Sequence, residues 1–151
     1  ENGMKRGFQM YASMITKEML KFEAEHFKIF VDDEIIEGAF TTVAIANAAM
    51  YGYNFSIAPL AELTDGFMDI VLIKKASLMR TIGSSWRMLN NSLDKSPLVE
   101  MKKSKEVTIQ IDKPYYYHID GESFAFEGKL HFKINPLSIN VLFPADRQNM
   151  N

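Results

Sequence analysis

Two short acidic segments carry the residue types that bind cations or move protons in proteins. Residues 63–69 read LTDGFMD and residues 119–123 read IDGES, so each places Asp-Gly beside further carboxyl or hydroxyl groups. Asp-Gly is also a favoured dipeptide of β-hairpin turns, and a β-rich domain is expected to contain several of them. The spacing alone therefore favours two ordinary turns.

The carboxylates of these segments still allow two kinds of chemistry. At the first turn, Asp65 would supply a carboxylate, and the backbone carbonyl groups of Glu62 and Phe67 could join it, with water, around a hard cation such as Mg²⁺. At the second, Asp120 and Glu122 are two residues apart, so on a strand they would share a face. Such a pair could hold magnesium or accept a proton from a hydroxyl group. The residues alone leave the choice between turn and site open.

Other kinds of catalytic or metal site are not indicated. The chain has no cysteine, which excludes disulfides and thiolate ligands and is typical of a reducing cytosol. It has no Gly-x-Ser-x-Gly elbow, no Walker loop and no G-x-G-x-x-G motif. The three histidines, His26, His118 and His131, are not spaced to place two metal ligands together on a helix or hairpin.

Length and composition indicate one globular domain over residues 1–151, with 47% hydrophobic and 24% charged residues. The net charge of -2 and the lack of a basic run argue against nucleic acid as a partner. The longest apolar run, around residues 44–51, is far too short to span a membrane, and no signal peptide is visible, so we expect a cytoplasmic protein. Because the chain begins with Glu1 rather than Met, we expect the natural N-terminus upstream.

Hydrophobic periodicity predicts a helix followed by a β-hairpin in the first third. The helix is expected over residues 5–24, where one apolar stripe recurs at spacings of three and four. Its members are Phe8, Tyr11, Ile15, Met19 and Phe22. The period then changes to two over residues 26–31, an acidic turn follows, and residues 40–47 form a β-branched return strand.

The remaining two thirds alternate strands with one more helix. We expect a short strand at 55–58, a strand at 68–73 that is apolar enough to be buried on both faces, and a helix from Ser77 to Leu89. The expected apolar side of this helix consists of Leu78, Ile82, Trp86 and Leu89. Further strands are expected at 107–111, 115–119, 129–135 and 138–143.

In the last two of these strands the alternation predicts which side chains face inward. The inward set comprises Leu130, Phe132, Ile134, Ile139, Val141 and Phe143. The whole pattern is that of a mainly β (α+β) fold, an antiparallel β-sandwich with two helices.

Taken in order, these segments resemble the diacylglycerol kinase-type lipid kinases. That family has an apolar strand ending in Asn, a Tyr-Gly or Gly-Gly loop, Ala-Pro, Asp-Asp-Gly, Leu-Asp-Val and, later, an Asp-Gly-Glu turn before its closing strands. The corresponding residues are Asn47, Tyr51 and Gly52, Ala58 and Pro59, Asp65 and Gly66, Met68 to Ile70, and Asp120 to Glu122. The similarity runs over nearly the whole chain.

The resemblance covers only half of such an enzyme. The family's N-terminal α/β domain carries a Gly-Gly-Asp-Gly-Thr string that cradles nucleotide phosphates, and this string is absent from the chain. The resemblance therefore implies the C-terminal domain of an NAD kinase/diacylglycerol kinase-like fold, which is similar to that of sphingosine kinases.

The resemblance also implies roles for the residues that match its motifs. Glu122 would help to activate the lipid hydroxyl group or arrange magnesium and phosphate, with Asp120 as its partner. Asn47 and the loop of Tyr51 and Gly52 would line the interdomain cleft and contact the nucleotide.

A structural magnesium site is implied at the first turn. Asp65 matches the second Asp of Asp-Asp-Gly, and the carbonyl groups of Glu62 and Phe67 would complete the ligand set. The first Asp of that motif is Thr64 here, which removes one charge from the expected cation site.

The function implied by the resemblance is transfer of the γ-phosphoryl group of ATP to a lipid alcohol such as diacylglycerol, with Mg²⁺ as cofactor. The chain alone would be inactive without the N-terminal kinase domain, and the apolar patch left by that domain would favour a homodimer. Transient contact with a membrane surface is also expected. Two alternatives remain: a kinase acting on a soluble alcohol or nucleotide, and a non-catalytic β-rich domain that binds a ligand or partner through its Met-rich, aromatic surface, including Tyr115 to Tyr117.

Overall fold

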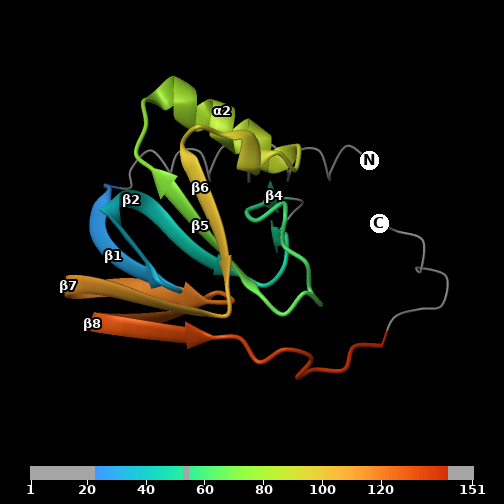
Figure 1. The fold of residues 1–151 in the computed structure, drawn as a ribbon. Helices are drawn as coiled ribbons and strands as arrows, with labels where there is room; N and C mark the ends of the chain where they lie inside the picture. Colours follow the sequence, from blue (N-terminus) through green and yellow to red (C-terminus); the bar gives the residue numbers. More distant parts are fainter. Residues whose placement is uncertain (1–22, 53–54, 143–151) are drawn as a thin grey trace.

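The computed structural model describes residues 23–52 and 55–142 (Figure 1). The helix predicted at 5–24 therefore lies outside the described residues except for Glu23 and Ala24, which are not helical. The elements are β1 (Glu25–Val31), β2 (Glu34–Ala46), β3 (Met50–Gly52), β4 (Phe55–Ser56), β5 (Met68–Lys74), α2 (Leu78–Leu89), the 3-10 helix η1 (Leu93–Lys95), β6 (Val99–Ser104), β7 (Glu106–Ile119) and β8 (Glu122–Lys133).

The strands form a six-stranded antiparallel sheet in the order β6-β5-β2-β1-β7-β8, with β3 and β4 as a separate pair. Three strands lie between β6 and β7 in this order, yet Lys105 alone joins them in the chain. The sheet must therefore curl strongly, and the Ser104 hydroxyl group at the end of β6 donates a 2.7 Å hydrogen bond to Asp32 in the β1–β2 turn. The described residues thus form a mainly β, sandwich-like fold, as predicted, and they contain one of the two predicted α-helices.

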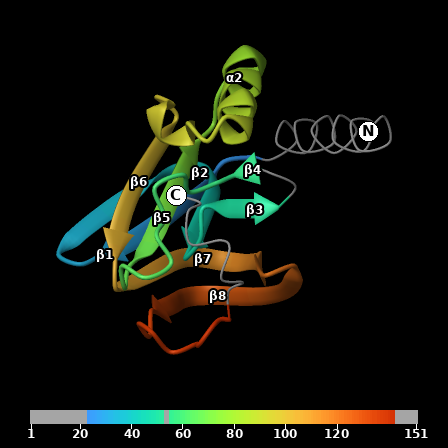
Figure 2. The same ribbon diagram turned by 90° about the vertical axis from the view of Figure 1, so that its right-hand side faces the viewer.

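Two hydrophobic cores lie on opposite faces of β5. Met68, Ile70 and Leu72 face the inner core, which the curled sheet closes with side chains from β1, β2 and β7. Val71 and Ile73 face the outer core, which α2, η1 and the segment after β4 cover, and Figures 1 and 2 show α2 lying across this side of the sheet. The prediction that residues 68–73 are buried on both faces is confirmed.

The buried side of α2 is only partly the predicted one: Leu89 packs against the outer core, but two other predicted residues do not. Ile82 and Trp86 are 47% and 66% exposed, while Ser84, Ser85 and Met88 are buried. The Ser84 hydroxyl group shares a 2.9 Å hydrogen bond with the Ser96 hydroxyl group, so a small polar side chain lies where an apolar one was expected. Short side chains let a helix approach a neighbouring element closely, and a satisfied hydroxyl group costs little when it is buried.

The end of the domain also differs from the prediction. Residues 138–142 do not form a strand, and Ile139 and Val141 are 79% and 62% exposed. After β8 the chain turns at Pro136 and at Leu137, whose φ of 53° is left-handed. This turn directs the chain away from β8, so the alternating apolar residues have no sheet to join. Leu130, Phe132 and Ile134 are half-buried as expected, and the predicted inward residue Phe143 lies outside the described residues.

Several strands were predicted incompletely. β2 and β8 begin earlier than predicted, at Glu34 and Glu122, and β3 was read as a loop. β6 was not predicted, because its sequence VEMKKS is largely polar, as edge strands often are. The predicted strands at 107–111 and 115–119 form one strand, β7, whose pairing with β8 is irregular between Ile111 and Tyr115. Pro114 lies in this irregular stretch, where a missing N–H group is tolerated.

Because β5 separates the two cores, a cavity there should cost more than the same change at the surface. Ile70→Ala is expected to lower the free energy of unfolding by about 2–5 kcal/mol, since Ile70 is 0% exposed. Ile35→Ala is the matched control, and we expect a loss below about 1 kcal/mol because Ile35 is 57% exposed. Urea denaturation of both variants measures the difference, and equal losses would contradict the assignment of β5 as the strand that lies between the two cores.

Candidate functional site

The Asp120–Gly121 turn joins β7 to β8 as a two-residue hairpin loop. Asp120 and Gly121 have φ values of 48° and 96°, which is the pattern of the mirror-image turns that suit hairpins and favour Asp-Gly. The turn prediction is therefore confirmed. The expectation that Asp120 and Glu122 share the face of a strand is wrong, because Asp120 belongs to the turn and Glu122 begins β8. Both carboxylates are exposed.

A hydrogen bond connects this hairpin to β3. The Tyr51 hydroxyl group lies 3.0 Å from Nε2 of His118, and the two rings meet edge to face with centroids 5.9 Å apart. Figure 2 shows β3 beside the β7–β8 hairpin. Asn47 is exposed in the bend after β2, and Gly52 ends β3. The structure thus brings the predicted cleft-lining segment close to the predicted catalytic carboxylates.

The first acidic segment is also a turn. The amide of Asp65 points to the carbonyl group of Glu62 at 3.5 Å, and the amide of Phe67 donates to Oδ1 of Asp65 at 2.9 Å. Gly66 has a φ of 77°, which an L-residue with a side chain adopts only with strain. The Asp65 carboxylate therefore stabilises its own turn in the way typical of Asx turns.

An ammonium group binds the same carboxylate. Nζ of Lys103 lies 2.5 Å from Oδ2 of Asp65 and 3.9 Å from Oδ2 of Asp69. Lys103 on β6 is the cross-strand neighbour of Asp69 on β5, which explains how it reaches both. Asp69 is 2% exposed, and its Oδ2 has no hydrogen-bond partner. We call Asp65, Asp69 and Lys103 the Lys103 cluster.

The two carboxyl groups of the Lys103 cluster are shifted in opposite directions. Burial raises the pKa of Asp69, and the nearby Asp65 and Glu62 charges add to this, while Lys103 opposes it. The hydrogen bond from Lys103 lowers the pKa of Asp65, and the bond from the Phe67 amide adds to this effect. The same bond to Asp65 raises the pKa of Lys103.

The Lys103 cluster does not fit a divalent cation in this arrangement. The Lys103 ammonium group already lies where a cation would approach Asp65. Within residues 23–52 and 55–142, no group of three histidine or acidic side chains converges to hold a metal ion. The predicted ligands Asp65, Glu62 and Phe67 lie in one turn, and in this structure the Lys103 ammonium group neutralises the Asp65 carboxylate.

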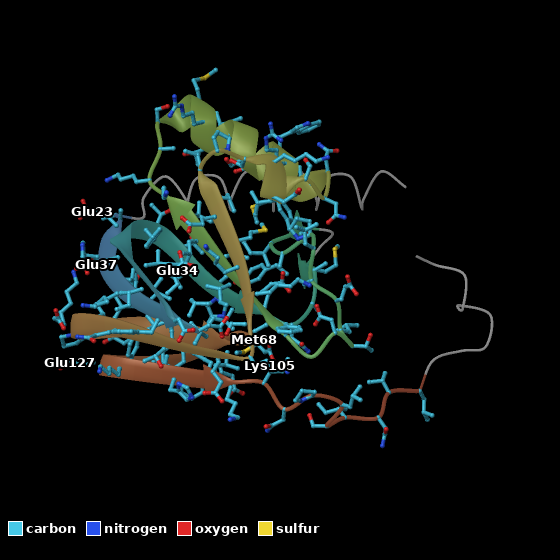
Figure 3. All side chains as sticks on the ribbon, viewed as in Figure 1. Glu23, Glu34, Glu37, Met68, Lys105 and Glu127 are labelled. Carbon is cyan, nitrogen blue, oxygen red and sulfur yellow. The ribbon has the colours of Figure 1, made fainter. Side chains whose placement is uncertain are left out.

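The two acidic turns do not form one site within this domain. β7 pairs with β8 from Glu106 beside Lys133 to Ile119 beside Glu122. The Lys103 cluster lies just before the start of β7, whereas the Asp120 turn lies at its far end. Figure 3 shows Met68 and Lys105, which adjoin the Lys103 cluster, together at the corner between β6 and β7.

Sequence reasoning gave no role to three residues that shape these sites. Asp69 was counted among the carboxylates beside the Asp-Gly turns, and it is the one charged residue in the apolar run FMDIVLI. Lys103 and His118 carried no signal in the sequence, since their importance depends on the register of β6 with β5 and on the approach of β3 to the hairpin.

The chain was compared with known families and structures. Residues 2–143 match the YegS C-terminal NAD kinase beta sandwich-like domain. The chain belongs to this family. It is also 26% identical over 147 residues to a diacylglycerol kinase of Staphylococcus saprophyticus subsp. saprophyticus, a match that covers 95% of this chain and 44% of that protein. The domain thus spans less than half the length of this curated relative.

Solved structures share the fold of this YegS C-terminal-type domain. Two crystal structures of Bacillus anthracis str. Sterne proteins assigned as diacylglycerol kinases match it with TM-scores of 0.66 and 0.57 and identities of 20% and 18%. Each match covers 83% of this chain, and the shares of the two larger chains are 41% and 48%. In the part of the domain that the structure describes, no helix combines the length and apolar character needed to cross a bilayer.

The opposite pKa shifts predict opposite effects of two neutralising substitutions. The lowered pKa of Asp65 contributes stability above its unfolded-state value, and this is lost as the pH falls through the folded-state value. Asp65→Asn should therefore lower Tm at about pH 7, and this effect should shrink as the pH falls below the ordinary aspartate pKa toward the lower folded-state pKa.

For Asp69 the pKa shift affects stability with the opposite dependence on pH. Its raised pKa favours folding below the unfolded-state value, and this contribution is lost as the pH rises through the folded-state value. Asp69→Asn should therefore match the original protein at acidic pH and equal or exceed its Tm at about pH 7. Thermal denaturation across this pH range tests both variants, and effects of the same sign would contradict the assignment.

Proposed function

We propose that this domain is the C-terminal half of an ATP-dependent lipid kinase of the diacylglycerol kinase type. The family membership, together with the Asp-Gly-Glu hairpin that the Tyr51–His118 hydrogen bond holds beside β3, is the observation that supports the proposal. Because the chain spans 44% of its curated relative, the complete activity would require an N-terminal nucleotide-binding half.

In the proposed reaction the hydroxyl oxygen of the lipid attacks the γ-phosphorus of ATP. A new O–P bond forms, the bond from the γ-phosphorus to the bridging oxygen breaks, and ADP leaves. Glu122 accepts the proton of the lipid hydroxyl group. Asp120, in the adjoining turn, helps to orient Glu122. Asn47, Tyr51 and Gly52 line the cleft toward the nucleotide. Magnesium, bound with ATP, would supply neutralisation of the phosphate charge.

The surroundings of Glu122 favour a lipid over a soluble alcohol or nucleotide. Ile119 is the cross-strand partner of Glu122. Phe124 follows Glu122 by two residues on β8, so all three side chains share a face. Ile119 and Phe124 are 49% and 41% exposed. An apolar surface beside the acidic group suits an acyl chain at a membrane surface, where a cytoplasmic enzyme would meet diacylglycerol transiently.

The segment after β8 suits a partner domain. Leu137, Ile139, Val141 and Leu142 are 82%, 79%, 62% and 99% exposed, and they follow one another within six residues. Exposed apolar runs of this kind mark interaction surfaces. We infer that the N-terminal kinase domain covers this segment, and that two copies of the isolated chain would associate through it as a homodimer.

The role of Glu122 can be tested in the complete protein that carries this domain. Glu122→Gln should lower the rate of diacylglycerol phosphorylation by about 10²–10⁴-fold, because the proton acceptor is lost. Calorimetry should show that Mg²⁺–ATP binding is retained. Glu127→Gln, an exposed carboxylate on the same strand, is the matched control and should retain full activity.

The outcomes separate the alternatives. Phosphorylation of glycerol or a nucleoside, but of no lipid, would favour a kinase for soluble substrates. Absence of Mg²⁺–ATP binding in the complete protein would leave a non-catalytic partner-binding domain. Unchanged lipid phosphorylation in Glu122→Gln would reject the assigned role of this residue.

The exposed terminal segment predicts concentration-dependent association of the chain. A double variant in which both Ile139 and Val141 are replaced by Asp should shift the equilibrium toward monomer, since charges would enter the apolar contact. Sedimentation velocity over a range of concentrations measures the shift. Ile35→Asp, an exposed apolar position on β2, serves as the control and should leave the association unchanged. A chain that remains monomeric at high concentration would contradict the prediction.

A further inference from the structure

The Lys103 cluster contains the features of a cation site. Oδ2 of Asp69 is buried without a hydrogen-bond partner. It lies 3.9 Å from Nζ of Lys103, which also contacts the carboxylate of Asp65. An ionised carboxylate in the interior is costly unless a positive charge lies nearby. The geometry therefore calls for a cation at this position.

The cation is supplied by the chain itself. Lys103 lies directly opposite Asp69 in the β5–β6 pairing, so the sheet places its ammonium group between the two carboxylates at 2.5 and 3.9 Å. An ammonium group offers three donors and needs no fixed coordination geometry. Thr64, just before Asp65, is neutral, so the turn carries fewer negative charges than two consecutive Asp residues would.

The ion pair fixes several elements at once. Asp65 belongs to the turn before β5, Asp69 to β5 and Lys103 to β6, so the ammonium group joins the turn to the sheet. Phe67 belongs to the same turn, and Nζ of Lys105 lies over its ring at 5.3 Å from the ring centroid. The turn therefore has anchors on β6 and on the connection to β7.

We propose that the Lys103 ammonium group serves as the built-in cation of this cluster, so that the 62–67 turn is held without a metal ion. A consequence is that the site is latent: removing the ammonium group would leave the Asp65 and Asp69 carboxylates without their positive partner, and carboxylate oxygens are ligands for hard divalent cations such as Mg²⁺ and Ca²⁺. This inference does not depend on the proposed kinase activity.

The test measures Tm with added chelator, Mg²⁺ or Ca²⁺ at constant ionic strength. The original protein should show the same Tm in all three conditions. Lys103→Met keeps most of the unbranched side chain but removes the charge, and it should lower Tm. Mg²⁺ or Ca²⁺ at about ten times its dissociation constant should then raise the Tm of this variant by about 3 °C or more. Adding Asp69→Asn to Lys103→Met should abolish this response.

Matched variants make the result specific. Lys102→Met removes the neighbouring lysine, which pairs with Glu34 at 2.9 Å, and should lower Tm without any response to divalent cations. Lys103→Arg keeps the positive charge and should remain indifferent to them. A Tm of the original protein that falls with chelator would overturn the proposal, and this measurement stands even if Lys103→Met does not fold. A Lys103→Met protein that folds but ignores both cations would overturn the latent site.

Discussion

The burial of β5 on both faces is the constraint on which the rest of this domain depends. A strand whose side chains alternate between two cores must have a layer on each side. The curled sheet supplies one layer through β1, β2 and β7, and α2 with η1 and the β4 region supplies the other. Loss of the inner layer would expose Met68, Ile70 and Leu72, and loss of the outer layer would expose Val71 and Ile73. The order of the sheet and the position of the helix both follow from this requirement.

The burial of β5 also explains why the Asp69 carboxylate near its start is paired with a lysine. Asp69 is buried with its apolar neighbours because β5 is buried on both faces, and its carboxylate cannot reach bulk water. Lys103 on the adjacent strand meets this need from the correct register position. The electrostatics of the 62–67 turn are therefore a consequence of the burial of β5, and they do not require the Asp120–Gly121 hairpin at the other end of β7.

That hairpin depends on a different kind of contact. Its acidic turn follows from the conformational preferences of Asp120 and Gly121, but its position relative to β3 follows from the bond between Tyr51 and His118, which are 67 residues apart in sequence. In the proposed function, the exposed carboxylates of Asp120 and Glu122 and the exposed apolar side chains beside them would form one wall of the site. The chain's share of its relatives' length is consistent with a second wall contributed by another domain.

Local pattern in the sequence determined the β1–β2 hairpin, the double burial of residues 68–73 and both Asp-Gly turns, because these depend on alternation and on left-handed backbone preferences of single residues. Tertiary structure alone decided which side of α2 is buried, since Ser84 finds a hydroxyl partner in Ser96 and Trp86 has no covering layer within the described residues. It also left Ile139 without a sheet to join, placed Lys103 against Asp69 and separated the two acidic turns. Periodicity reports which side chains are apolar, whereas register and curvature decide which neighbours they meet.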